Sequence, residues 1–121
     1  MPIIRVDADL FIQVLINIIN NAVKFTEKGT ITLSVEVTTD NISFKIADEG
    51  YGINPANLKN VFDKFFIIRS GDTLSNQKLG TGLGLPICKE IIEHYDGKIW
   101  AESDGMNGSV FHIMLPAEII T

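Results

Sequence analysis

Residues 8–25, with the sequence ADLFIQVLINIINNAVKF, carry the strongest structural signal in the chain. Their apolar side chains recur at steps of three and four residues, which is the periodicity of an amphipathic helix with one buried face. These side chains are Phe11, Val14, Leu15, Ile18, Ile19, Ala22 and Phe25. Asp7 stands at the position of an N-cap, and Gly29 follows as a stop signal. The stretch therefore predicts one long amphipathic helix.

A β-hairpin is predicted directly after this helix. Residues 30–37 alternate between polar and apolar side chains, and residues 42–46 do so again after a turn at 39–41. Alternation with a period of two puts one set of side chains on one face of a strand. In the first run this set is Ile31, Leu33, Val35 and Val37. The two runs with the turn between them are typical of a hairpin.

The remaining elements complete a sandwich of one sheet and one helical layer. Asn54-Pro55 predicts a short helix that ends near Phe65, because Asn caps helices and Pro fits their first position. A second long helix is predicted from about Leu83 to Asp96. Strands are predicted at 3–6, 98–102 and 109–115. The fold class is therefore an α/β (α+β) two-layer sandwich, with one mixed β-sheet covered on one face by about three helices.

The composition indicates a single domain over residues 1–121. With 45% hydrophobic residues, a chain of 121 residues buries one ordinary core but not two. The formal charge of −5 argues against nucleic acid and against direct contact with a membrane surface. The single cysteine, Cys88, excludes an internal disulfide and suits a small buried group in a reducing compartment. We expect this domain to lie in the cytoplasm. Its parent protein could be anchored in a membrane.

Residues 67–79 differ from the rest of the chain because they show no apolar period. A structureless stretch of this length inside a compact domain is usually functional. We therefore predict that about 67–79 form a lid.

The first chemical motif lies on the long helix. Asn17, Asn21 and Lys24 are spaced so that all three project from one face. Amide oxygens are ligands that suit Mg²⁺, which keeps several waters and takes only a few protein oxygens. A lysine one turn further on suits phosphate as a point charge. The competing interpretation is an ordinary solvated polar face.

Two glycine motifs follow further along the chain. Asp48 ends a predicted strand and precedes Gly50 and Gly52, so its carboxylate can accept from an amino group while the glycines let a flat ligand approach. The run 80–85, GTGLGL, opens a helix whose N-terminus favours phosphate. It is neither a P-loop nor a dinucleotide fingerprint. The competing interpretations are a hairpin-exit turn for the first motif and a flexible joint for the second.

In their order along the chain, these motifs resemble the C-terminal catalytic, ATP-binding domain of sensor histidine kinases, in the GHKL ATPase superfamily. The resemblance covers nearly the whole chain, and residues 13–26 look like a full asparagine box. The motifs are Asn17-x-x-x-Asn21, Asp48-x-Gly50-x-Gly52, Phe62-x-x-Phe65-Phe66, Gly80-Thr81-Gly82-Leu83-Gly84-Leu85 and Asn107-Gly108-Ser109-Val110-Phe111. The resemblance implies the GHKL ATP-binding fold.

The resemblance also implies an activity and a set of site residues. The chain would bind Mg²⁺ and ATP and transfer the γ-phosphate to a histidine on a separate dimerisation and phosphoacceptor domain of the same protein. A downstream response regulator would complete a two-component system. Asn21 and Asn17 would hold Mg²⁺, and Asp48 would accept from the adenine amino group. The other implied ATP-binding residues are Lys24, Phe25, Gly50, Gly52, Ile53, Phe65, Gly80, Thr81, Gly82, Leu83 and Gly84. Phe62, Phe65 and Phe66 would anchor the lid.

Two positions depart from the family pattern. Relatives often carry a basic residue directly after the paired aromatics, where this chain has Ile67, with Arg69 two places on. A contact between lid and phosphate is therefore left open. Asn107 stands where many relatives have glycine, in a turn that shapes the fold rather than the pocket.

Position 17 separates kinase from hydrolase. In ATPase relatives a glutamate commonly stands there as general base, because water and serine hydroxyls are poor nucleophiles. Asn17 cannot take a proton, whereas neutral imidazole already offers a lone pair. A histidine kinase is therefore favoured over two alternatives: a non-catalytic ATP-binding module, and a GHKL ATPase or anti-sigma serine kinase. Neither His94 nor His112 is followed by the glutamate or aspartate of the family's acceptor pattern, so the acceptor histidine and its base are expected outside this chain.

Overall fold

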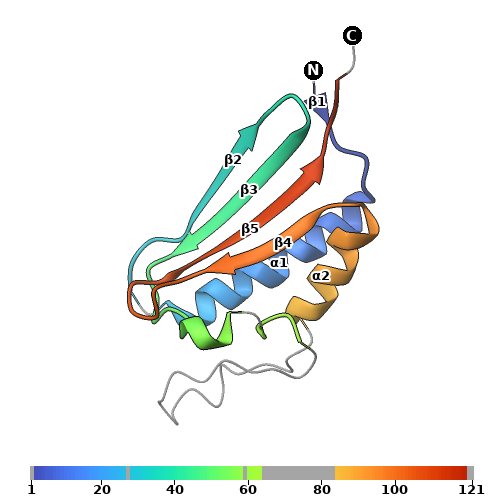
Figure 1. The fold of residues 1–121 in the computed structure, drawn as a ribbon. Coiled ribbons are helices and arrows are strands. Elements are labelled where there is room, and N and C mark those ends of the chain that lie inside the picture. Colours follow the sequence, from blue (N-terminus) through green and yellow to red (C-terminus); the bar gives the residue numbers. More distant parts are fainter. Residues whose placement is uncertain (1, 27, 59, 64–83, 120–121) are drawn as a thin grey trace.

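The computed structural model describes residues 2–26, 28–58, 60–63 and 84–119, and Figure 1 shows their arrangement. The two α-helices are α1 (Ala8–Phe25) and α2 (Gly84–His94), with a 3₁₀ turn η1 at Pro55–Asn57. The strands are β1 (Pro2–Ile3), β2 (Thr32–Val37), β3 (Asn41–Asp48), β4 (Lys98–Glu102), β5 (Ser109–Pro116) and β6 (Glu118–Ile119). No helix among these residues is long and apolar enough to cross a bilayer.

The sheet has four strands in the order β2-β3-β5-β4, and β1 pairs separately with β6. The two-layer α+β class is confirmed, but all strand pairs among the described residues are antiparallel, where the sequence predicted a mixed sheet. The reason lies in the strand order. β3 and β4, on either side of the connection that contains α2, run in the same direction, yet β5 lies between them and pairs with both.

Both helices lie on one face of this sheet, as Figure 1 shows. α1 packs on β3 and α2 on β4, and the two helices pack against each other. The core between the layers is apolar, with Phe11 and Phe44 in ring contact at 5.1 Å at one end. The fully buried residues at its centre are Val14, Ile18, Ile46, Val61, Cys88, Ile92, Phe111, Ile113 and Leu115. The burial of Cys88 that the sequence predicted is confirmed.

The long helix has the bounds that its periodicity predicted. The Asp7 side chain caps α1 by accepting from the Leu10 N–H at 3.1 Å. α2 carries Pro86 in its first turn and is followed by Asp96, whose φ of 62° leads the chain out of the helix. Both helices are thus defined by local signals at their ends.

The short helix predicted from residue 54 to 65 is wrong over most of the residues that the structure describes there. Only Pro55–Asn57 form a 3₁₀ turn, capped by the side chain of Asn54. Further turns follow, in which Asn60 N donates to the Asn57 carbonyl and Asp63 N to the Asn60 carbonyl, each at 2.9 Å. Asparagine competes for backbone hydrogen bonds and favours turns, so its recurrence at every third position breaks the helix.

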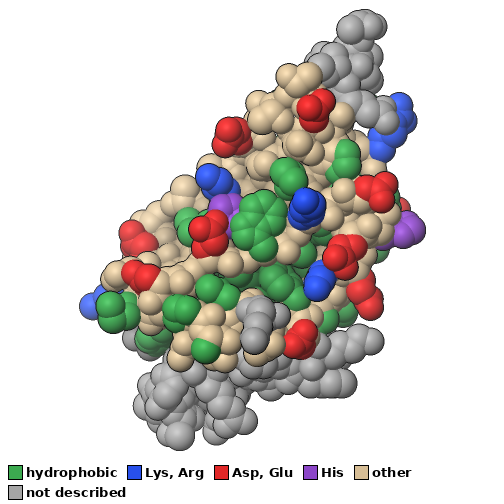
Figure 2. All heavy atoms as spheres, in the orientation of Figure 1, with side chains coloured by type: hydrophobic (Ala, Val, Ile, Leu, Met, Phe, Trp, Pro, Cys, Tyr) green, Lys and Arg blue, Asp and Glu red, His purple; other side chains and the backbone are tan. Residues whose placement is uncertain are grey.

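The face of the sheet opposite to the helices carries a mixed surface. Figure 2 is viewed from this side and shows hydrophobic, acidic, basic and histidine side chains intermixed. Trp100 lies here, 38% exposed and stacked on His112 with 4.8 Å between the ring centroids, so it is not part of the core. Tyr95 does pack against the core, and its hydroxyl accepts from the Asp7 N–H at 3.1 Å.

Candidate nucleotide-binding site

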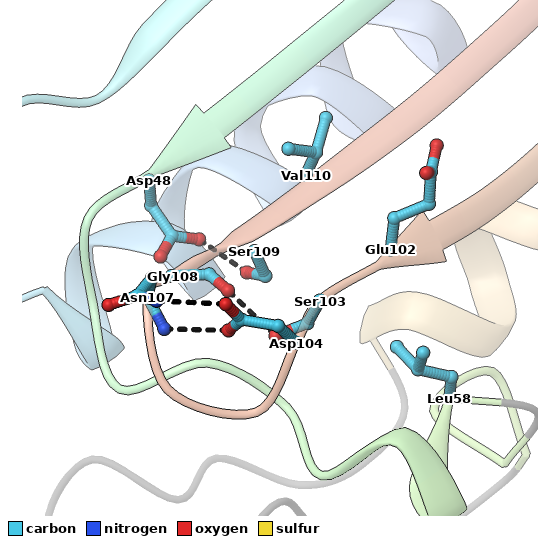
Figure 3. Close-up of a pocket in the computed structure, with 9 residues that line it drawn as sticks. All are labelled: Asp48, Leu58, Glu102, Ser103, Asp104, Asn107, Gly108, Ser109 and Val110. Carbon is cyan, nitrogen blue, oxygen red and sulfur yellow. Dashed lines mark hydrogen bonds between the residues drawn. The ribbon is translucent and has the colours of Figure 1, made fainter.

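A buried carboxylate at the end of β3 is the centre of the candidate site. Asp48 is only 7% exposed. The Ser109 hydroxyl donates to its Oδ2 at 2.6 Å, and the Gly50 N–H donates to its Oδ1 at 2.9 Å, as Figure 3 shows for the serine. These two bonds fix the orientation of the carboxylate. A carboxylate offers about four lone-pair positions, so Asp48 keeps acceptor capacity for a ligand.

A pocket of about 560 Å³ lies beside this carboxylate, which is a volume typical of small-molecule sites. It runs between the end of β3 and the turn that joins β4 to β5 (Figure 3). Its lining residues are Asp48, Leu58, Glu102, Ser103, Asp104, Asn107, Gly108, Ser109 and Val110. An amino group that enters this pocket can therefore meet a fixed, buried acceptor.

Ser109 is a site residue that the sequence reasoning missed, because residues 107–111 were assigned to the fold alone. Two signals in the chain point to it. Ser109 continues the inward alternation of Phe111, Ile113 and Leu115 along β5, which makes a hydroxyl there a buried polar group in need of a partner. In the sheet, Ser109 lies directly opposite Asp48. The first signal is local, but the second requires the strand register.

The turn at 103–108 is held rigid by two side chains. Ser103 Oγ accepts from Ile53 N at 2.8 Å and donates to the Gly108 carbonyl at 2.7 Å. Asp104 accepts from the backbone N–H groups of Asn107 and Met106, and from the Asn107 side chain, each at 2.8 Å. These hydrogen bonds hold the pKa of the Asp104 carboxyl below its usual range, and the bond from the Asn107 N–H has the largest effect. Asn107, the departure from the family pattern, is thus tied into the turn, but it also lines the pocket, so the expectation that this position shapes the fold rather than the pocket was wrong.

Two glycines let the backbone come close beneath the site. Gly108 has φ 90°, and a Cβ there would overlap the carbonyl oxygen of Asp48. Gly52 has φ 81°, and its Cβ would lie 2.9 Å from the backbone of Gly105. Gly52 and Ile53 therefore brace the turn from below, and Ile53 is buried in the core. Neither lines the described pocket.

The asparagine face of α1 lies apart from this pocket, on the flank that faces α2. A Cβ at Gly84 would lie 3.9 Å from Asn17 Cγ, so the start of α2 touches this flank. Asn21 and Lys24, one and two turns further along the same face, are half-buried. The structure thus confirms the shared helical face, while Asn17, Asn21 and Lys24 do not line the pocket beside Asp48.

Several predicted residues lie outside the described part of the chain. They are Phe65, Phe66, Gly80, Thr81, Gly82 and Leu83, together with the predicted lid at 67–79. Phe25 ends α1, and its side chain is not described. Phe62 is described and packs edge-on against Phe111, with 6.2 Å between ring centroids. Phe62 therefore holds the segment that precedes the predicted lid against the core.

Cys88 joins the two helices beneath the asparagine face. Its thiol donates to the Val14 carbonyl at 3.6 Å. Burial raises its pKa to about 11, against a smaller opposing effect of a hydrogen bond with Asn17. Folding therefore favours the protonated thiol. That contribution to stability is present below the ordinary pKa of 9.0 and is lost as the pH rises toward 11.

We expect native Cys88 to resist alkylation at pH 8. The thiolate is the reactive species, and both burial and the raised pKa of the thiol keep its population low. Maleimide labelling followed by mass spectrometry should therefore be slow in the folded chain and complete within minutes in denaturant. Cys88→Ala is the blank. Native labelling at the denatured rate would mean that the α1–α2 contact opens freely.

The sequence and the fold of this chain are similar to those of known proteins. The chain belongs to the family described as histidine kinase-, DNA gyrase B- and HSP90-like ATPases, which matches residues 6–119. The relatives that it matches include sensor histidine kinases. Sensor protein KdpD of Clostridium acetobutylicum is 42% identical over 117 residues, which cover 96% of this chain and 13% of that protein.

Solved structures place the chain among the catalytic domains of histidine kinases. The nucleotide-free catalytic domain of histidine kinase ThkA aligns with a TM-score of 0.77 and 33% identity, over 93% of this chain and 71% of that one. Full-length ShkA in complex with AMPPNP aligns with a TM-score of 0.83 and 27% identity, over all of this chain and 24% of that one. The chain spans between 9% and 29% of the length of the curated relatives that it matches.

Proposed function

We propose that this chain binds Mg-ATP and transfers the γ-phosphate to a histidine on a separate helical phosphoacceptor domain of the same protein, within a two-component pathway. The observation that carries the proposal is the Asp48 carboxylate, buried beside a pocket and held by Ser109 and Gly50. A fixed acceptor in a small-molecule pocket suits the exocyclic amino group of adenine. The single domain over 1–121 and its cytoplasmic location are part of this proposal.

The face of α1 that carries Asn17, Asn21 and Lys24 would receive the triphosphate. Asparagine amide oxygens are hard ligands, and Mg²⁺ is often bound through few protein groups plus phosphates and waters. In the described residues no three His, Cys, Asp or Glu side chains gather into a metal cage. The donor set therefore fits a metal that arrives with its nucleotide. Asn21 and Asn17 would hold Mg²⁺, which neutralises phosphate charge, and Lys24 would contact phosphate.

The transfer itself needs little proton chemistry from this chain. The imidazole lone pair of the acceptor attacks the γ-phosphorus, the bond to the bridging oxygen of the β-phosphate breaks, and ADP leaves. The imidazole N–H proton passes to a base beside the acceptor. Asn17 offers no base for water, so hydrolysis is disfavoured. The two histidines of the chain contact other side chains. His94 packs against Tyr95, and His112 stacks on Trp100 and pairs with Glu102.

A phosphotransfer assay tests this function. When this chain is mixed with ATP, Mg²⁺ and the helical phosphoacceptor domain of its parent, we expect an acid-labile, base-stable phosphoramidate on that domain and no label on the chain itself. Asn21→Ala should lower the transfer rate roughly tenfold through loss of one metal ligand. Asn20→Ala is the matched control, because Asn20 is exposed on another face of α1.

Three results would contradict the proposal. One is equal transfer by Asn21→Ala and the unchanged chain. Another is label on the isolated chain that His94→Ala or His112→Ala abolishes. The third is ATP binding without any transfer, which would favour a non-catalytic module.

A further inference from the structure

The inner face of β2 is apolar but uncovered. Leu33, Val35 and Val37 lie directly opposite Ile46, Phe44 and Ile42 of β3. Directly opposed residues of antiparallel strands point to the same side, so all six face the helical layer. Ile46 and Ile42 are buried by it, whereas the three β2 side chains are 48% to 54% exposed. The apolar side chains of β2 thus share one face, but about half of their surface is exposed to solvent.

A second set of exposed apolar side chains lies on α1. Ile12, Ile16 and Val23 are 51% to 56% exposed. With ~100° between successive residues of a helix, they fall within ~40° of one another and ~100–180° around the helix from Asn17 and Asn21. The asparagine flank faces α2. The apolar flank therefore lies on the side of α1 away from α2, the side on which β2 lies, and it is turned ~120–160° around the helix from the buried Ile18. We call the six residues Ile12, Ile16, Val23, Leu33, Val35 and Val37 the α1–β2 apolar surface.

The layer geometry explains why this surface is open. Strands lie ~4.8 Å apart and helices pack roughly 8–10 Å apart, so two helices cover about three of the four strands. Here α1 and α2 cover β3, β5 and β4, and Figure 1 shows β2 extending beyond them. A third helix beside α1 would rest on β2 below and on the apolar flank of α1 at its side. The two apolar sets have the arrangement that such a helix requires.

We propose that the α1–β2 apolar surface is the docking site of one amphipathic helix from another part of the same polypeptide. β2 has six residues, and because strands rise ~3.3 Å and helices ~1.5 Å per residue, a helix of about 13 residues spans it. Its apolar residues recur at steps of three and four. Basic residues flank them, because this chain carries a formal charge of −5. This docking does not depend on the nucleotide site.

The size of the surface favours a tethered partner over a free one. Full burial of a Val, Leu or Ile side chain stabilises by ~1.5–3 kcal/mol, at ~25 cal/mol per Å² of apolar surface. Because the six side chains are about half exposed, together they offer on the order of 300 Å² of apolar surface. Stable complexes of separate proteins bury roughly 800 Å² on each partner. A second copy pairing through this surface alone falls well short. A linked segment acts at an effective concentration on the order of millimolar, for which a small contact suffices. The relatives are long enough to supply one, because the chain spans at most 29% of their length.

Site-specific photo-crosslinking in the full-length polypeptide tests the proposal. Benzoylphenylalanine is placed at Val35 and, separately, at Ile16, one on each wall of the surface. Ser34 is the matched control, since it neighbours Val35 but points to the other face of β2. We expect Val35 and Ile16 to crosslink to one helix of the same polypeptide, at residues three or four apart and at least tenfold above Ser34. Both sites are exposed, so the isolated variants should melt within about 2–4 °C of the unchanged chain.

Four outcomes would overturn the proposal. They are crosslinks from Val35 to β2 of a second copy, crosslinks only to an unlinked protein, crosslinks scattered without a preferred helix, and yields no higher than those of Ser34. If benzoylphenylalanine prevents expression, Val35→Lys replaces it, with Ser34→Lys as control. In the full-length polypeptide, Val35→Lys should raise amide hydrogen exchange of one helix outside residues 1–121 at least tenfold, whereas Ser34→Lys should not. Equal exchange in the two variants also overturns the proposal.

Discussion

Asp48→Asn should weaken ATP binding by ~10- to 150-fold, which corresponds to roughly 1.5–3 kcal/mol for a lost hydrogen bond to a charged acceptor. The amide can still accept from Ser109, so the fold should survive. Its NH₂ group, however, must face either the Gly50 N–H or the adenine amino group, and both are donors. Isothermal calorimetry of ATP binding measures the loss, and thermal melting without nucleotide checks the fold.

The matched control for Asp48 is Asp104→Asn. Asp104 lines the same pocket, but its carboxylate is exposed and already accepts from the backbone of its own turn. This control should change ATP affinity by less than about threefold, as expected for an exposed polar substitution. If the two variants lose affinity equally, the pocket responds to charge alone, and the adenine assignment of Asp48 is wrong.

Gly108→Ala should destabilise the chain by about 2–6 kcal/mol, the sum of two effects. The left-handed φ of 90° costs a non-glycine residue ~1–3 kcal/mol. Overlap of the new Cβ with the Asp48 carbonyl adds a further ~1–3 kcal/mol. Urea unfolding at constant protein concentration measures the change. Because the displaced group is Asp48 itself, ATP binding should fall as well.

Gly84→Ala is the control for this glycine. Its Cβ would meet only Asn17, at an ordinary contact distance of 3.9 Å, and alanine favours a helix over glycine by ~1 kcal/mol. Unfolding without nucleotide should therefore show no loss of stability. A Gly108→Ala chain as stable as Gly84→Ala would mean that the turn relaxes around the methyl group.

Local signals in the sequence were enough to predict the elements with strong patterns. The α1 bounds follow from its apolar period and the Asp7 cap, and the bounds of β4 and the start of β5 follow from alternation between glycine turns. Asp48 could be identified as an acceptor because it ends a strand before two glycines. In each case the deciding residues belong to one continuous stretch of sequence, so no knowledge of the tertiary fold was required.

Non-local features could not be predicted in the same way. The insertion of β5 between β3 and β4, which makes the sheet antiparallel, depends on pairing between residues 61 or more positions apart, such as Asp48 and Ser109. The exposure of Trp100 depends on which face of the sheet the helices cover, because alternate residues of β4 are half-buried and exposed. The alternation of β2 correctly gave one apolar face, but alternation carries no information on whether a helix covers it.

The stack of Trp100 on His112 gives the chain a built-in optical reporter. Trp100 is its only tryptophan, so intrinsic fluorescence has a single source. His112 Nε2 lies 2.5 Å from Glu102 Oε1, and Glu102 also lines the pocket beside Asp48. Three side chains thus connect the wall of that pocket to the indole ring. An occupant that moves the Glu102 carboxylate changes the charge next to the imidazole and, through it, the emission of a ring that never touches the ligand.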